Sequence, residues 1–239
     1  MGIYARIRAF LQALKPGNGG RLWRMKKDFF TLLGFDRPYT DFELLLVNDG
    51  STDASGDICE EYGDQDPRVI VIQKENTGVS DSRNRALDRA RGKYLQFLDS
   101  DDWITPDATE SLVRAAVEDD CDLVIADFYR VNGKHYVEKK HIKKKDVMSR
   151  EEFAMEMADD PADYYYGVMW NKLYRRSIIE EHELRCDASM NWCEDFLFNL
   201  QFIRHGQRFR ALQKPIYYYM KRKGSLVATE SVSVDAVKL

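Results

Sequence analysis

The sequence lacks the features of a secreted or membrane-spanning protein. Apolar runs such as residues 44–47 are far shorter than the roughly 20 residues that cross a bilayer, and no signal-peptide core is visible. The four cysteines form no Cys-x-x-Cys pair and are accompanied by only four histidines, which indicates reduced thiols and no structural zinc. We therefore expect a cytoplasmic protein, either soluble or located at the inner face of the membrane.

The chain as a whole also lacks an excess of positive charge. Its 36 Lys and Arg residues face 40 Asp and Glu residues, so nucleic acid is not expected as a partner. The first 28 residues are the exception, with seven basic residues and one acid, and residues 3–14 show helical spacing of apolar side chains. This basic arm, residues 1–38, could lie on an anionic membrane surface. Packing on its own domain and a frayed tail are the alternatives.

Short apolar runs alternate with helical patterns in the segment that follows the arm. The runs cover residues 42–47, 69–72, 94–98 and 123–128, and the helical patterns cover residues 53–63, 80–90 and 106–118. This alternation predicts an α/β fold with a mostly parallel sheet flanked by helices, whose ligands bind beyond the carboxyl ends of the strands. We assign residues 39–227 to this domain, with halves meeting near residue 130 and a tail at 228–239.

The apolar run at residues 94–98 leads directly into Asp-Ser-Asp-Asp, which we call the acidic turn (residues 99–102). Because strand side chains alternate, Asp99 and Asp101 can point the same way at the end of the strand. Two carboxylates suit Mg²⁺ or Mn²⁺, which completes its coordination with water and substrate phosphate oxygens. A nucleotide diphosphate is then the implied substrate. Alternatively, the turn only ends the strand and caps a helix beginning near residue 105.

Two further strand ends carry polar groups that could bind such a donor. In residues 47–53, Gly50 permits a tight turn, Ser51 can cap the next helix, and Asp49 can accept hydrogen bonds from a base or ribose. An Asx turn is the alternative for Asp49. In residues 75–86, Arg83 falls in the first turn of a helix, where positive potential favours a phosphate, although it could equally be a surface arginine.

Glu194 and Asp195 begin a later helical pattern, after Trp192. Favourable interaction with the helix dipole accounts for one carboxylate, and the second suggests a working base. The lysine-rich run at residues 139–145 is interpreted as a solvated surface, with contact to an anionic acceptor or membrane as the alternative.

Taken in order, these motifs resemble the bacterial family-2 glycosyltransferases with the GT-A fold. The resemblance covers about residues 39–227, through segments 47–53, 76–84, 97–102, 170–174, 194–195 and 217–225. It implies a metal-dependent, inverting enzyme that moves a sugar from a nucleotide-sugar, a UDP-sugar, to a hydroxyl of a carbohydrate or lipid-linked acceptor. Polysaccharide or glycolipid synthesis is the implied process, and the sequence gives no indication of oligomeric state.

The resemblance also implies a role for each motif. Asp195 would be the catalytic base, Asp99 and Asp101 would bind Mg²⁺ or Mn²⁺, and Asp99 would also contact the ribose. The remaining donor-side residues would be Asp49, Gly50, Ser51, Arg83, Arg222 and Ser225, the last two in a segment that closes over the diphosphate. The acceptor side would be shaped by Trp170, Lys172 and Glu194.

The sequence departs from this family at its start. Members normally begin with an apolar strand ending in Pro-x-Tyr-Asn in the middle of the sheet, and the basic arm stands in its place. Two other hypotheses therefore stay open. One is an inactive remnant that acts as a binding or assembly partner, and the other is a nucleotidyltransferase, which would use Asp99 and Asp101 without Glu194 and Asp195.

Overall fold

The computed structural model describes residues 41–133, 135–160, 163–190 and 192–220. The predicted basic arm, the tail, Arg222 and Ser225 lie outside these ranges. Within them, no helix combines the length and the apolar character that crossing a membrane requires.

The first half of the described chain alternates strands and helices as predicted. Its elements are β1 (Leu44–Asp49), α3 (Ser55–Gln65), β2 (Val69–Lys74), α4 (Val79–Arg89), β3 (Tyr94–Gln96), β4 (Trp103–Ile104), α5 (Ala108–Glu118) and β5 (Leu123–Asn132). Each predicted strand and helix is present, with ends displaced by a few residues. Buried apolar runs and helical periodicity were therefore sufficient to locate these elements.

The second half of the described chain is less regular. It contains β6 (His135–Lys139), α6 (Arg150–Ala158), α7 (Tyr164–Gly167), β7 (Lys172–Arg175), α8 (Arg176–Glu181), α9 (Glu194–His205) and β8 (Phe209–Met220). A capping box opens α6, because Ser149 Oγ accepts from the Glu152 amide at 3.2 Å and Glu152 Oε2 accepts from the Ser149 amide at 2.9 Å.

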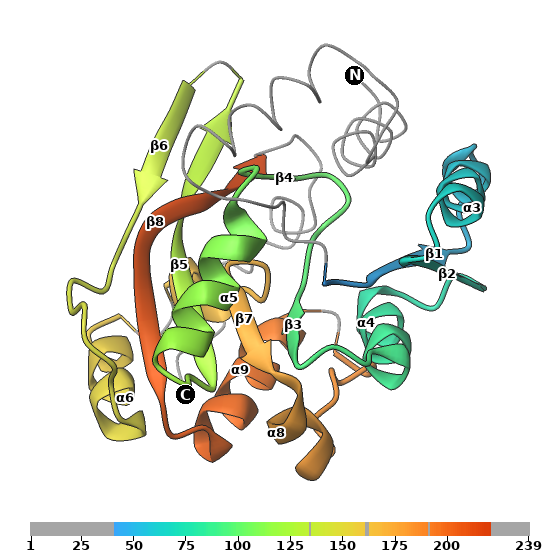
Figure 1. The fold of residues 1–239 in the computed structure, drawn as a ribbon. Coiled ribbons are helices and arrows are strands. Elements are labelled where there is room, and N and C mark those ends of the chain that lie inside the picture. Colours follow the sequence, from blue (N-terminus) through green and yellow to red (C-terminus); the bar gives the residue numbers. More distant parts are fainter. Residues whose placement is uncertain (1–40, 134, 161–162, 191, 221–239) are drawn as a thin grey trace, which may run out of the picture.

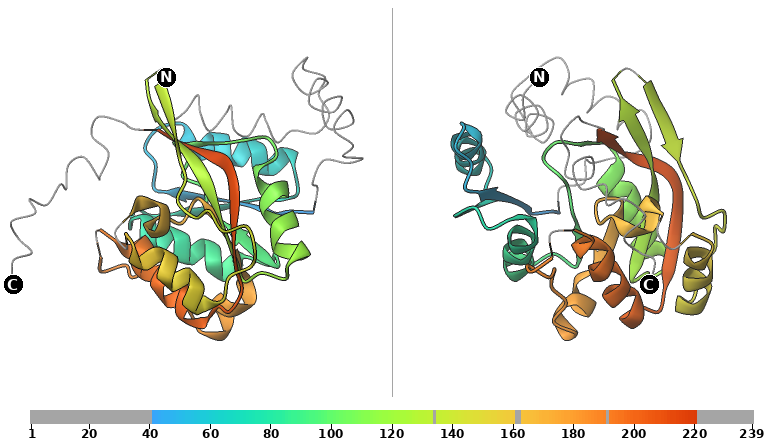
Figure 2. Two further views of the ribbon diagram at one scale, coloured as in Figure 1. Left: turned by 90° about the vertical axis from the view of Figure 1, so that its left-hand side faces the viewer. Right: turned by 180° about the vertical axis from the view of Figure 1, so that it is seen from behind.

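The strands form two sheets, each flanked by helices (Figures 1 and 2). β1 and β2 form a parallel pair, and the larger sheet has the order β3-β7-β5-β8-β4, with β6 paired to β5. The α/β class is confirmed, but the larger sheet is more mixed than a mostly parallel one. In it β5 and β8 are parallel, whereas the other pairings are antiparallel. The reason is that β6, the next strand after β5 along the chain, pairs with β5 directly, and that β7 lies reversed between β3 and β5.

The main core surrounds β5, whose first six residues are all buried. Aromatic rings of α9 pack on β7, where Tyr174 lies 5.8 Å from Phe198 and 5.1 Å from Phe202 between ring centroids. Burying a large apolar side chain stabilises the fold by about 1.5–3 kcal/mol. This core fixes the relative positions of β3, β7 and α9, which carry much of the site described below.

The β1–β2 pair has a much smaller core of its own. Ile58, Tyr62 and Val69 are its buried members, and every residue of β1 is only half-buried. Among the described residues, β1 pairs only with β2, and β3 pairs only with β7. Glu43 joins the two sheets at their start, since its Oε1 accepts from the amides of Arg91 and Gly92 at 2.5 and 3.0 Å.

Candidate active site

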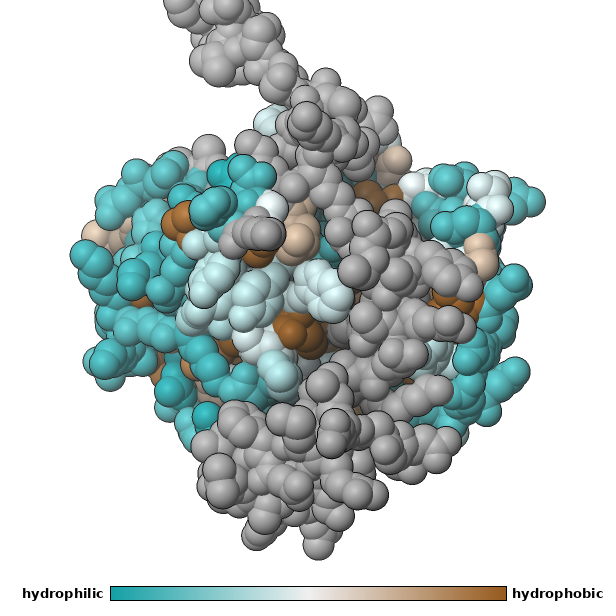
Figure 3. Space-filling view, turned by 90° about the horizontal axis from the view of Figure 1, so that it is seen from above, coloured by the Kyte–Doolittle hydropathy of each residue, from teal (hydrophilic) through white to brown (hydrophobic). Residues whose placement is uncertain are grey.

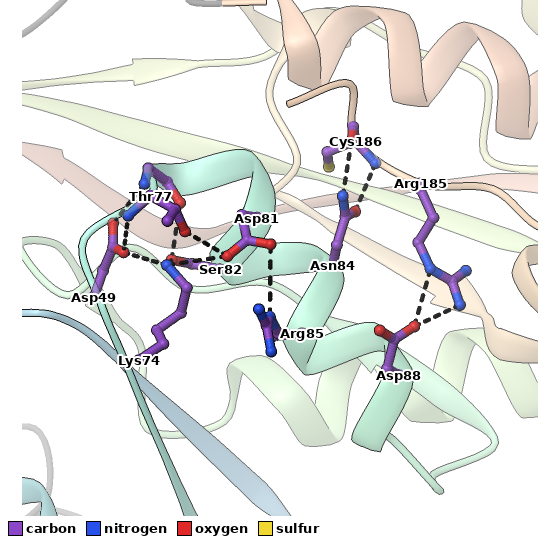
Figure 4. Close-up of polar contacts among 11 residues, drawn as sticks. Asp49, Lys74, Thr77, Asp81, Ser82, Asn84, Arg85, Asp88, Arg185 and Cys186 are labelled. Carbon is purple, nitrogen blue, oxygen red and sulfur yellow. Dashed lines mark hydrogen bonds and ion pairs between the residues drawn. The ribbon is translucent and has the colours of Figure 1, made fainter. Parts of the chain in front are cut away.

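Asp49 joins the end of β1 to the turn before α4 (Figure 4). Its Oδ1 accepts from Lys74 Nζ and from the Thr77 amide at 2.9 Å, and its Oδ2 accepts from the Gly78 amide at 3.0 Å. Partial burial raises the pKa of Asp49, but Lys74 and the two amides outweigh it, so the pKa lies below its usual value. Asp49 is thus held as a carboxylate at the carboxyl edge of the smaller sheet.

Gly50 makes the turn after β1, with a φ of 64°. A Cβ atom at this position would lie 2.6 Å from the Asn76 backbone nitrogen, so a side chain would push the two turns apart. Ser51 follows in an exposed position, and its amide donates to Asn48 Oδ1 at 3.2 Å. The predicted Asx-type turn is therefore present, but it is made by Asn48 rather than by Asp49.

The acidic turn lies between β3 and β4. It does not cap the next helix, because α5 begins at Ala108 and Asp107 occupies its N-cap position. Asp99 keeps 37% of its side-chain exposure, whereas Asp102 is 7% exposed. Surrounding protein raises the pKa of Asp99, Arg83 opposes this effect, and Asp101 and Glu194 add to it. Excess negative charge therefore accumulates at this turn.

Arg83 links the acidic turn to the start of α9. Its Nη1 lies 2.9 Å from Glu194 Oε1, and its Nη2 lies 3.7 Å from Asp99 Oδ1. The guanidinium is 13% exposed, so it is held by these contacts rather than extended into solvent. The surface-arginine interpretation of Arg83 is inconsistent with this position. The segments that contain Arg83, Asp99 and Glu194 are distant in sequence, and they meet around the Arg83 guanidinium.

Asp195 lies beside Glu194 in the first turn of α9. Its Oδ1 accepts from the Phe196 amide at 2.8 Å. Burial raises the pKa of Asp195 and the neighbouring Glu194 raises it further, while Arg83, the Phe196 amide and Lys172 lower it. A carboxylate with a raised pKa is a stronger base than an exposed one. Carboxylates that act as general bases commonly have pKa values shifted in this direction.

Trp170 and Lys172 lie behind the site rather than on its surface. Trp170 is 2% exposed and Lys172 is fully buried. Lys172 Nζ donates to the carbonyls of Tyr165 at 3.1 Å and Val168, and to Asn171 Oδ1 at 2.8 Å. Burial lowers the pKa of Lys172 to about 7, although Asp195 opposes this change. These two residues therefore do not line the acceptor surface directly: Lys172 acts on the charge of Asp195 and on the turn that contains α7, and Trp170 supports Tyr217 and Tyr219.

This burial predicts a pH effect on stability. The Lys172 pKa is about 7 in the folded protein and near 10.5 when unperturbed, so Lys172 destabilises the fold increasingly as pH falls from about 10.5 to about 7. Over that window the free energy of unfolding should rise with pH, by at most about 1.4 kcal/mol per pH unit. Thermal denaturation between pH 7.5 and 9.5 should show a flatter stability curve for Lys172→Met than for the wild type. The exposed-residue control Lys145→Met should keep the wild-type slope, and parallel curves for all three proteins would contradict this prediction.

Several tyrosines near the carboxylates had no role in the sequence-based assignment. Tyr217 stacks on Trp170 with centroids 4.1 Å apart, Tyr219 stacks on the same ring at 5.6 Å, and the Tyr164 ring lies 5.2 Å from that of Tyr219. Tyr164 is 38% exposed, and burial raises its pKa, with Tyr219, Asp195 and Asp99 adding to the effect. The signal was present in the tyrosine-rich runs 164–166 and 217–219. Lys74, which pairs with Asp49, was missed as well.

Seen from above, the described part of the molecule shows a pale area of intermediate hydropathy with a few apolar residues, next to strongly hydrophilic residues on its left (Figure 3). The partly exposed ring of Tyr164 can contact the apolar face of an organic ligand, while charged groups bind the polar atoms of that ligand.

The residues of the acidic turn fit a divalent cation. Asp99 and Asp101 are hard oxygen donors in one turn, and Asp101 raises the pKa of Asp99 through their mutual repulsion. The described residues contain no group of three or more His, Cys, Asp or Glu side chains arranged to bind a metal. Mg²⁺ and Mn²⁺ commonly use one or two protein carboxylates together with substrate phosphates, so two carboxylates are sufficient for such a site.

The helix-flanked sheet, with a carboxylate-rich turn at a strand end, is the GT-A-like α/β fold. The chain belongs to glycosyl transferase family 2, whose model matches residues 29–183.

Known relatives and solved structures agree with this family. Glycosyltransferase GlyA of Streptococcus pneumoniae is 35% identical over 199 residues, which cover 79% of this chain and 27% of GlyA. The uncharacterized glycosyltransferase EpsJ of Bacillus subtilis is 32% identical over 189 residues, which cover 78% of this chain and 55% of EpsJ. The crystal structure of Staphylococcus aureus TarS 1-349 in complex with UDP-GlcNAc superposes with a TM-score of 0.68 at 27% identity, covering 83% of this chain and 55% of TarS. The chain thus spans about half the length of EpsJ and of the TarS structure, and less of GlyA.

Proposed function

We propose that this protein is a metal-dependent, inverting glycosyltransferase that moves a sugar from a UDP-sugar to a hydroxyl of a carbohydrate or lipid-linked acceptor. The observation that carries the proposal is the meeting of Asp99, Arg83 and Glu194 next to Asp195, from three separate parts of the chain. UDP-GlcNAc in the TarS complex and the name of the Staphylococcus aureus protein, poly(ribitol-phosphate) beta-N-acetylglucosaminyltransferase, support a nucleotide-sugar and a polysaccharide product.

In this mechanism Asp195 removes the proton from the acceptor hydroxyl, and the oxygen attacks the anomeric carbon of the donor. The bond from that carbon to the diphosphate breaks, and a single displacement inverts the anomeric configuration. A raised pKa makes Asp195 a better base for this proton. Glu194 directly precedes Asp195 in the chain, and Arg83 Nη1 lies 2.9 Å from Glu194 Oε1. This ion pair fixes the start of α9, the helix that presents the base.

Asp99 and Asp101 would hold the Mg²⁺ or Mn²⁺. The bound cation supplies positive charge that stabilises the departing diphosphate. Asp49, Gly50 and Ser51 lie at the carboxyl end of β1, where the base and ribose of the donor would bind. We keep Arg222 and Ser225, outside the described residues, as proposed contacts of the diphosphate.

We further propose that the enzyme acts in the cytoplasm, at the inner face of the membrane when its acceptor is lipid-linked. The lysine-rich segment 139–145 supports peripheral contact with an anionic surface, because Lys139, Lys140, Lys143 and Lys145 are exposed. Lys144 is engaged with Glu152 at 2.6 Å.

Isothermal titration with UDP tests the donor site directly. We expect binding in the presence of Mn²⁺ that weakens at least about tenfold after chelation, since metal and diphosphate contribute to one site. Product analysis then separates the alternatives: a glycosyltransferase releases UDP from a UDP-sugar, and a nucleotidyltransferase releases pyrophosphate from UTP and a sugar phosphate. A folded protein that binds no UDP with Mn²⁺ would refute the enzyme proposal and favour the inactive remnant.

A further inference from the structure

The acidic turn is fastened to the end of β8 by side-chain hydrogen bonds. The Asp99 amide donates to the Tyr217 hydroxyl at 3.3 Å, and that hydroxyl donates to Asp102 Oδ2 at 2.8 Å. The other oxygen of Asp102 accepts from the Met220 amide at 2.9 Å. The hydroxyl therefore uses its one proton and one lone pair to connect the two ends of the turn.

Packing fixes the direction of this hydroxyl. Tyr217 is 1% exposed, and its ring lies nearly parallel to that of Trp170, with an interplanar angle of 13°. Backbone pairing holds the same region, because Trp103 pairs with Tyr218 and the Thr105 amide donates to the Ile216 carbonyl at 2.8 Å. The hydroxyl thus belongs to a rigid support beneath the turn, whereas Asp99 on the turn is partly exposed.

We propose that Tyr217 is a positioning residue for the donor site: its hydroxyl, together with Asp102, holds the acidic turn in the conformation that brings Asp99 and Asp101 together. This inference rests on the proposed function and adds to it a residue that makes no contact with the donor itself. Two carboxylates that repel each other tend to separate. If Tyr217 and Asp102 hold the turn in place, the free-energy cost of bringing the carboxylates together is met when the protein folds and does not weaken the binding of the metal and the donor. Groups that orient metal ligands typically change metal affinity by about 10 to 100-fold when removed.

The test removes only the hydroxyl. Tyr217→Phe keeps the ring on Trp170, and we expect UDP to bind about tenfold more weakly in the presence of Mn²⁺. KM for the donor should rise by a similar factor while kcat changes less, since the base at Asp195 is untouched. The matched control is Tyr166→Phe: Tyr166 is also 1% exposed, and its hydroxyl donates to the Glu156 carbonyl at 3.0 Å, in a contact with α6 that involves neither the acidic turn nor β8. This control should lose similar thermal stability and keep wild-type UDP affinity.

A second measurement needs no ligand. Hydrogen–deuterium exchange of the amides at residues 99–102 should be faster in Tyr217→Phe than in the wild type, and unchanged in Tyr166→Phe. Unchanged exchange in Tyr217→Phe, or UDP affinity equal to that of the wild type, would overturn the positioning role. If the wild type itself binds no UDP while exchange at the turn accelerates in Tyr217→Phe, the proposed function fails and the fastening of the turn stands.

Discussion

Asp195→Asn should lower turnover by about 10² to 10⁴-fold and leave donor affinity nearly unchanged. A general base contributes this range of rate, and an amide cannot accept the acceptor proton at a useful rate. Asparagine has the same shape, and its Oδ1 can still accept from the Phe196 amide, so the start of α9 should be preserved. The measurement is the initial rate of UDP release from a panel of UDP-sugars, with UDP affinity determined separately by titration.

The control for this change is Asp187→Asn. Asp187 is exposed and accepts from the amide and hydroxyl of Ser189 at 2.8 and 2.6 Å, so it tests the loss of one nearby carboxylate outside the site. Since burial raises the pKa of Asp195 above 3.8, wild-type kcat should fall on acidification at a higher pH than an exposed aspartate would give. Wild-type turnover in Asp195→Asn would remove this residue from the catalytic role.

Asp101→Ala should lower the affinity for UDP in the presence of Mn²⁺ by at least about 100-fold, and sugar transfer should be lost as a result. Removing one carboxylate from a two-carboxylate site takes away half of its protein ligands. Even residues that only orient metal ligands typically change metal affinity by about 10 to 100-fold when they are removed. Folding should be retained, because the loss of Asp101 relieves repulsion at Asp99 and Asp102. Titration of UDP at fixed Mn²⁺ and of Mn²⁺ at fixed UDP gives both affinities.

Asp64→Ala is the matched control, since it removes an exposed carboxylate of α3 and should bind UDP and Mn²⁺ as the wild type does. The opposite patterns expected for Asp101→Ala and Asp195→Asn distinguish a ligand of the metal from a base. Sugar transfer at the wild-type rate in both variants would show that the assignment of these carboxylates is wrong.

The sequence predicted best where local patterns decide the structure. Continuous apolar runs located β1, β2, β3 and β5. The pairing directions could not be predicted in the same way. β7 is four residues long and lies reversed between β3 and β5, an arrangement that depends on packing between distant segments.

The positions of single residues in the site could not be predicted from the sequence either. Composition predicts that a lysine is exposed, yet Lys172 is fully buried because two carbonyls and Asn171 accept its hydrogen bonds. The sequence left Arg83 undecided between a phosphate ligand and a surface residue. Only the folded chain shows it between Asp99 and Glu194. Residue types and local spacing identify the candidates, and their convergence is a property of the tertiary structure.

The ion pair between Arg83 and Glu194 joins residues that are 111 positions apart. At synthesis rates of about 5–20 residues per second, roughly 6–22 seconds separate the appearance of these two side chains at the ribosome. For most of that interval Asp99, which follows Arg83 by 16 residues, has been synthesised, whereas α9 with the proposed base Asp195 has not. Arg83 and Asp99 are therefore synthesised well before Glu194, and Tyr217 of β8, which we propose holds the acidic turn, follows later still.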